Sequence, residues 1–242
     1  MIFGDQFCVG IYDRAGAQFS SYQNLWDNAL SPSGGKLVSL DFIRVVRSLT
    51  CDMSLVELGQ DPTVKRLSGK ELLKWQEIIH PGHSNEKSMP IFRVGMGKGP
   101  HCWYTIGPPL WSSVSLLGRG TVVWKVIDSL TRKIFVLKNT WHHGERQSEA
   151  DIYRAIKGSH PGLAELESGA DVVFPDAPER TITVANTRDP NASSEESSPV
   201  LHRLVLKTVG RPLWEAKTEL ELLQGICAAL EGKLHCLLRC AS

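Results

Sequence analysis

Two apolar segments rich in β-branched residues, joined by a short polar turn, lie in the middle of this chain. Residues 121–127 and 134–138 are rich in valine and isoleucine, and residues 129–132 lie between them. β-Branched residues favour strands, and a short polar connection between two such segments favours an antiparallel hairpin. Gly118 and Gly120 lie at the entrance of this hairpin. The sequence therefore predicts an antiparallel sheet containing this pair of strands.

Other segments predict helices as well as strands. Apolar side chains recur at helical spacing in three places, and short apolar runs recur in four more. The helical candidates are residues 39–50, 144–156 and 219–230, and the strand candidates are residues 103–106, 172–174, 181–184 and 203–209. We therefore expect the α+β class.

The chain is expected to consist of two parts that meet near residue 110. Residues 1–110 are an N-terminal α+β region, and residues 111–242 contain the glycine turn and the hairpin. Within the second part, residues 186–200 are rich in serine, proline and acidic residues and poor in apolar ones. Such a segment cannot offset its ordering entropy by burial, so it is interpreted as a flexible insert.

Composition excludes several classes of protein. The 242 residues carry 27 Lys+Arg and 26 Asp+Glu, a net charge of +1, which leaves no basic excess for nucleic acid. No apolar run reaches the roughly 18 residues of a membrane span. The first 13 residues lack the pattern of a signal peptide, so an intracellular location is expected. The six cysteines include no pair with CxxC spacing, and reduced thiols are the interpretation.

Three features that follow one another along the chain suggest a nucleotide-binding site. The glycines of Gly118-Arg119-Gly120 allow a backbone to approach a ligand closely, although such a pair is also common in a plain turn. Lys138 lies on the paired strand, where it reaches a nucleotide beneath the glycines or points to solvent. Glu149 lies in a predicted helix, where it pairs with Lys138 or is solvated. Glu145 and Asp151 compete for that role. A glycine turn, a strand lysine and a helix glutamate are the plan of a protein kinase upper lobe.

At this point the chain resembles the fungal-type protein kinase family, from about residue 7 to about residue 231. The matching strings in the second part are GRGTVVWKV (118–126), VLKNTW (136–141), RQSE (146–149), HRLVL (202–206) and VGRPL (209–213). In the first part they are VGIYDRAG (9–16), FIRVV (42–46) and LGQDPT (58–63). Val123 stands where the glycine-rich loop of kinases often has a third glycine, a departure that family members commonly share.

The resemblance implies a kinase-like upper lobe of antiparallel sheet and one helix, a hinge near residues 207–213, and the first helices of an incomplete lower lobe. It also implies that ATP lies against Gly118, Arg119, Gly120 and Thr121. Lys138 would contact the phosphates and Glu149 would position Lys138. The implied activity is phosphoryl transfer to serine or threonine of a protein substrate, with Mg²⁺ in a complete family member.

The chain departs from the family pattern after residue 232. The 242 residues contain neither a His-Arg-Asp sequence, typical of the catalytic loop, nor an Asp-Phe-Gly sequence, which binds the metal. Phosphoryl transfer needs groups of both kinds. We therefore expect a truncated, inactive kinase domain, in which Leu220, Leu223 and Leu230 lack their usual partners.

Two alternatives stay open. The first is a non-catalytic, pseudokinase-like module that binds a protein through residues 1–110. The second is a zinc module built on His80, His83, His101 and Cys102. The remaining polar candidates receive structural interpretations. His142 and His143 are expected to face solvent, Trp124 and Trp141 to anchor packing, and Asp13 and Asp61 to serve turns.

Overall fold

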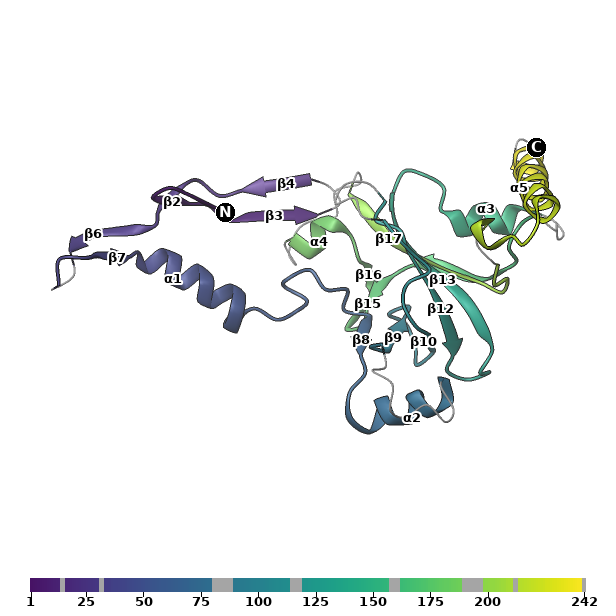
Figure 1. Cartoon of the computed structure of the whole chain (residues 1–242), viewed down its shortest axis with the longest axis horizontal. Helices are drawn as coiled ribbons and strands as arrows, with labels where there is room; N and C mark the ends of the chain where they lie inside the picture. Colours follow the sequence, from purple (N-terminus) through teal and green to yellow (C-terminus); the bar gives the residue numbers. More distant parts are fainter. Residues whose placement is uncertain are drawn as a thin grey trace.

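An antiparallel sheet with a few helices around it forms the centre of the computed structural model (Figure 1), which confirms the α+β class. The structure describes residues 1–13, 16–30, 33–79, 89–113, 119–156, 162–188, 198–210 and 213–240. Along the sheet the strands are β14 (Leu166–Asp171), β17 (Pro199–Leu206), β13 (Ile134–His143), β12 (Val122–Asp128), β10 (Cys102–Thr105), β9 (Phe92–Gly95) and β8 (Val64–Arg66). β11 (Trp111–Ser112) also pairs with β12. The sheet thus contains strands from both sides of residue 110.

The expected hairpin is formed by β12 and β13, which pair from Val122 opposite Asn139 to Ile127 opposite Ile134. Asp128 closes the turn, because its Oδ1 accepts hydrogen bonds from the backbone N–H groups of Leu130 and Thr131 at 2.9 and 2.6 Å. β13 continues five residues past Lys138, further than the sequence predicts. The extension is polar, but it pairs with β17 as far as His143 opposite Pro199.

The ends of the segment interpreted as a flexible insert are ordered. α4 (Val184–Arg188) includes Asn186, whose side-chain amide donates to the carbonyl of Thr181 at 2.9 Å. Ser198 is buried and its Oγ accepts from the backbone N–H of Ala185 at 3.0 Å. Residues 189–197 lie outside the described residues. The side chains of Asn186 and Ser198 therefore satisfy backbone groups, a role that composition alone does not reveal.

Two neighbouring elements also differ from the prediction. Residues 181–184 are not one strand, because β16 (Ala177–Thr181) ends where they begin and α4 starts at their last residue. β16 pairs with β15 (Val173–Phe174), which forms inside the expected strand 172–174.

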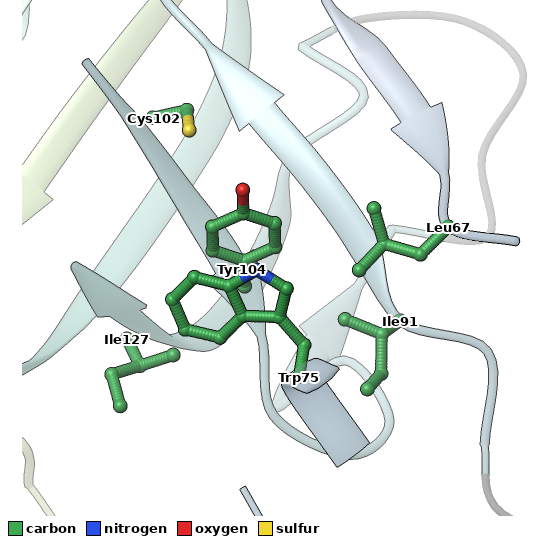
Figure 2. Close-up of a cluster of buried hydrophobic side chains, with 6 residues drawn as sticks. All are labelled: Leu67, Trp75, Ile91, Cys102, Tyr104 and Ile127. Atoms are coloured by element: carbon green, nitrogen blue, oxygen red, sulfur yellow. The ribbon is translucent and has the colours of Figure 1, made fainter. Parts of the chain in front are cut away.

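Two apolar clusters lie on opposite faces of the sheet. Figure 2 shows the first, where α2 (Gly69–Ile79) places Trp75 against Tyr104. Their rings are stacked with centroids 3.6 Å apart. Successive side chains of a strand point to opposite faces, so Trp103 belongs to the second cluster. The first cluster is Leu67, Trp75, Ile91, Cys102, Tyr104 and Ile127, and the second is Val94, Trp103, Val126, Phe135, Leu137 and Val205.

The N-terminal elements project from one end of the sheet in Figure 1. They comprise β1 (Ile2–Phe3), β2 (Gln6–Phe7), β3 (Gly10–Asp13), β4 (Gly16–Phe19), β5 (Gln23–Asn24), β6 (Trp26–Leu30), β7 (Lys36–Val38) and α1 (Leu40–Arg47). Ser39 caps α1, since its Oγ accepts from the backbone N–H of Phe42 at 3.2 Å. A single π-helical segment, Ser48–Asp52, completes the helix expected over 39–50.

The last helix, α5 (Glu219–Cys240), is longer than the 219–230 predicted and follows a 3₁₀ turn at Leu213–Glu215. Leu220, Leu223 and Leu230 are 65%, 58% and 63% exposed, so the apolar face that they form is uncovered, as the sequence predicts. Across the described part of the chain, no helix combines the length and apolar character needed to cross a membrane.

Candidate functional site

The side chains of Lys138 and Glu149 form an ion pair on one face of the sheet. The Nζ of Lys138 donates to both carboxylate oxygens of Glu149, at 2.8 and 2.7 Å. Lys138 lies on β13 between Val123 of β12 and Leu204 of β17, which fixes its backbone from both sides. The two side chains are 26% and 29% exposed, so the pair is half-buried and accessible to a ligand.

Glu149 is placed by α3 (Glu149–Ala155), which begins later than the 144–156 predicted because Ser148 is its N-cap. The Oγ of Ser148 accepts from the backbone N–H of Asp151 at 3.2 Å and donates to the Asp151 carboxylate at 2.7 Å. The hydrogen bond that Ser148 donates to the carboxylate, with the ion pair to Arg154 at 2.7 Å, holds the pKa of Asp151 below its ordinary value. Asp151 is therefore engaged elsewhere, and Glu145 is exposed, so the structure brings Glu149 to Lys138.

A close approach between α3 and β14 fixes the distance of the helix from the sheet. Ala150 is fully buried against Gly169 of β14. A Cβ at Gly169 would lie 2.7 Å from the Cβ of Ala150 and 2.8 Å from Cδ1 of Leu204. Glycine at position 169 thus permits the packing that sets Glu149 beside Lys138.

Replacing Gly169 with alanine is expected to reduce the free energy of unfolding by about 1–3 kcal/mol through overpacking. The added methyl group forces α3 away from the sheet, because the Cβ of Ala150 cannot rotate aside. Urea denaturation measures the effect. Gly95→Ala is the matched control, since its new Cβ meets no atom closer than 3.9 Å. Equal stability of the two variants would contradict this account of α3.

The glycine turn lies beside the same strand, where it contacts the second and third residues after Lys138. The carbonyl of Arg119 accepts from the backbone N–H of Trp141 at 2.8 Å, and the hydroxyls of Thr121 and Thr140 are 3.3 Å apart. Gly120 is buried with φ +48°, a left-handed conformation that favours glycine. Gly118 lies outside the described residues. The structure therefore brings Arg119, Gly120 and Thr121 to the Lys138 strand.

A cavity of about 880 Å³ opens beside this ion pair. Its lining carries four cationic side chains, Arg119, Lys138, Arg146 and Lys233, and one carboxylate, Glu149. Thr140, Trp141, His142, His143, Gln147, Ile152, Pro199 and His202 complete the lining. Gly120 and Thr121 are not among these residues. The volume suits a small molecule, and the excess of cations favours an anionic one.

The histidines differ from their predicted environments. His142 is not directed to solvent: its side chain is 13% exposed and its Nε2 lies 3.1 Å from Oδ1 of Asp171. His143 is exposed, as predicted. Of the proposed zinc module, His80 and His83 lie outside the described residues. His101 pairs with Asp128, whereas Sγ of Cys102 accepts from Nε of Arg93 at 3.3 Å.

Arg203 is a buried polar residue whose role the sequence reasoning missed. Its side chain is fully buried on β17, and its Nη2 lies 2.7 Å from Oδ2 of Asp61. Burial lowers the pKa of Arg203, and the charge of Asp61 opposes that effect. Asp61 also makes its expected turn hydrogen bond, from the backbone N–H of Thr63 at 2.8 Å. The sequence does carry one signal for this pair: Arg203 is a charged residue inside an apolar strand, and such a residue needs a buried partner.

The structure combines three features: an antiparallel sheet, the helix α3 packed on it, and a cationic cavity beside the Lys138–Glu149 ion pair. Comparison with protein families shows which family has this sequence. A family model described as fungal protein kinase matches residues 1–240. The chain belongs to the fungal protein kinase family, which confirms the resemblance found in the sequence. A search of curated proteins found no match.

Proposed function

We propose that the cavity beside Lys138 and Glu149 binds the phosphates of ATP. The observation that carries this proposal is the ion pair in which Lys138 Nζ contacts both oxygens of Glu149 at the cavity wall. Protein kinases use such a pair to hold a strand lysine against the α- and β-phosphates. Membership of the fungal protein kinase family supports the choice of ATP as the anion.

The arrangement of elements supports a kinase-like upper lobe. The glycine turn precedes β12, the lysine lies on β13 and the glutamate begins α3, which is the order of a protein kinase. Lys138 contributes charge to the phosphates, Glu149 holds its ammonium group in place, and Arg119 and Arg146 add positive potential at the cavity wall. Residues 207–213 would then form the connection to the lower lobe.

The chain on its own is proposed to bind nucleotide without transferring a phosphoryl group to protein. Mg²⁺ requires oxygen ligands. Among the described residues that line the cavity, Glu149 is the only carboxylate, and it is paired with Lys138. The lining therefore does not fit a bound Mg²⁺. The 242 residues also contain no His-Arg-Asp or Asp-Phe-Gly sequence to orient a hydroxyl or hold the metal.

Lys138→Ala is expected to weaken nucleotide binding about 10- to 100-fold, the effect of losing a hydrogen bond between charged groups. Titration with a fluorescent ATP analogue measures the affinity, and the thermal shift with ATP provides a second reading. Lys133→Ala is the matched control, because Lys133 is exposed at the far end of the hairpin. Absence of nucleotide binding by the unaltered chain, or equal affinity of the two variants, would contradict the proposal.

A second candidate is a protein-binding function of the N-terminal region, as in a non-catalytic pseudokinase. It is favoured by the apolar stripe of α1 and the turn that follows, where Leu40, Ile43, Val46 and Leu49 are 62%, 49%, 42% and 42% exposed. Such a stripe is typical of a surface that a partner covers. A chain that folds but does not bind nucleotide would leave this as the better-supported function.

A further inference from the structure

Three metal-ligating side chains meet on neighbouring strands at one end of the sheet. His142 lies on β13, His202 on β17 and Asp171 on β14. His202 lies on the middle strand of the three. It is opposite Asp171 of β14 on one side and opposite Thr140 of β13 on the other. Thr140 and His142 are two residues apart on one strand, so they point to the same face. The register of the sheet therefore places all three side chains on one face.

The nitrogen and oxygen atoms of the cluster converge. Nδ1 of His202 lies 2.7 Å from Oδ1 of Asp171, and Nε2 of His142 lies 3.1 Å from the same oxygen. One ligand atom from each residue lies within 4.8 Å of the others. Two ligands of a tetrahedral zinc ion are about 3.3 Å apart, given metal–ligand distances of about 2.0–2.1 Å. Small side-chain movements would admit an ion.

The hydrogen bond that His142 makes outside the cluster orients its ring. Nδ1 of His142 lies 2.8 Å from the backbone carbonyl of His143, which only accepts, so Nδ1 carries the proton. Nε2 is then the ring nitrogen of His142 that faces the carboxylate of Asp171, at 3.1 Å. The carbonyl also serves as the outer-shell partner that orients a metal-bound histidine.

His202 is the buried member of the cluster. Its side chain is 1% exposed, and its two ring nitrogens have different surroundings: Nδ1 contacts Asp171, whereas Nε2 is a buried atom without a hydrogen-bond partner in the described structure. His202 and His142 both line the 880 Å³ cavity, so a ligand can reach them from that side.

We propose that His142, Asp171 and His202 form a binding site for a divalent transition metal of the zinc class. Two imidazoles and one carboxylate suit Zn²⁺, whereas Mg²⁺ prefers oxygen ligands throughout. Three protein ligands leave a fourth position open, at the wall of the cavity that contains Lys138. The ion would also join β13, β17 and β14. The site does not depend on nucleotide binding.

The test is zinc binding by the full chain, purified without a polyhistidine tag, stripped with chelator and free of nucleotide. Competition with a chromophoric chelator is expected to give one Zn²⁺ per chain, and added Zn²⁺ is expected to raise the melting temperature. His142→Gln and Asp171→Asn should each weaken binding more than the roughly 10- to 100-fold that loss of an outer-shell partner costs. His143→Gln is the matched control, because it retains the carbonyl that His142 contacts.

Co²⁺ substitution of the unaltered chain keeps the test decisive if a variant fails to fold. Visible bands of tetrahedral cobalt with nitrogen and oxygen ligands are expected. A sulfur-to-cobalt charge-transfer band would assign the metal to cysteine and overturn the proposal. No stoichiometric zinc binding, or equal affinity of folded His142→Gln and His143→Gln, would also overturn it. Because nucleotide is absent, failure here would leave the ATP site unaffected.

Discussion

Replacing Asp61 with alanine is expected to lower the free energy of unfolding by about 3–5 kcal/mol, because it leaves a buried guanidinium without its counter-charge. Arg203 is fully buried, and arginine does not lose its proton in proteins. Its Nε lies 2.6 Å from Oδ1 of Asn139 and its Nη1 lies 2.9 Å from Oγ1 of Thr63. These neutral acceptors satisfy hydrogen bonds but not the charge. Chemical denaturation followed by circular dichroism measures the loss.

Two further variants separate the charge effect from lost packing. Asp41→Ala removes an exposed ion pair with Arg44 and is expected to cost less than about 1 kcal/mol. Arg203→Met combined with Asp61→Ala removes both charges, and should recover most of the stability lost in Asp61→Ala alone. If Asp61→Ala is no less stable than Asp41→Ala, the charge of Asp61 does not stabilise the buried guanidinium of Arg203.

The elements that sequence analysis located are those whose pattern is local. The β12–β13 hairpin followed from β-branched residues on either side of a short turn, and its partners are close in the chain. Lys138 and Glu149 are separated by 11 residues, one on a strand and one at a helix start. That short separation, together with the order typical of kinases, was enough to predict that they meet. Whether they hold ATP stays a prediction.

The features that sequence analysis missed depend on distant pairing. Asp61 and Arg203 are separated by 142 residues, and Asp171 and His202 by 31. The polar end of β13 resembled the end of a strand, because Asn139 and Thr140 are not apolar. Both are buried, and Asn139 accepts a hydrogen bond from Arg203. Polar residues inside a sheet satisfy one another across strands, and no local pattern reveals those partners.

The interpretation of residues 1–110 as a separate part leads to the second prediction. Trp75 lies in α2, before residue 110, and is 4% exposed. It is stacked on Tyr104, and the guanidinium carbon of Arg132, in the hairpin turn, lies 4.3 Å from its ring centroid (Figure 2 shows the stacked rings). Ile127 of β12 belongs to the same cluster. Trp75 therefore packs against residues on both sides of the expected division.

Trp75→Ala is expected to cost about 3–5 kcal/mol, the loss typical of removing a buried tryptophan from a core. Because the cluster joins α2 to the β12–β13 hairpin, both should unfold in one cooperative transition in the unaltered chain. Hydrogen exchange measured by mass spectrometry compares residues 69–79 with residues 122–143 as urea is raised. Leu73→Ala, in the same helix but 66% exposed, is the control and should change stability by less than about 0.5 kcal/mol. Two separate transitions would instead support independent domains on either side of residue 110.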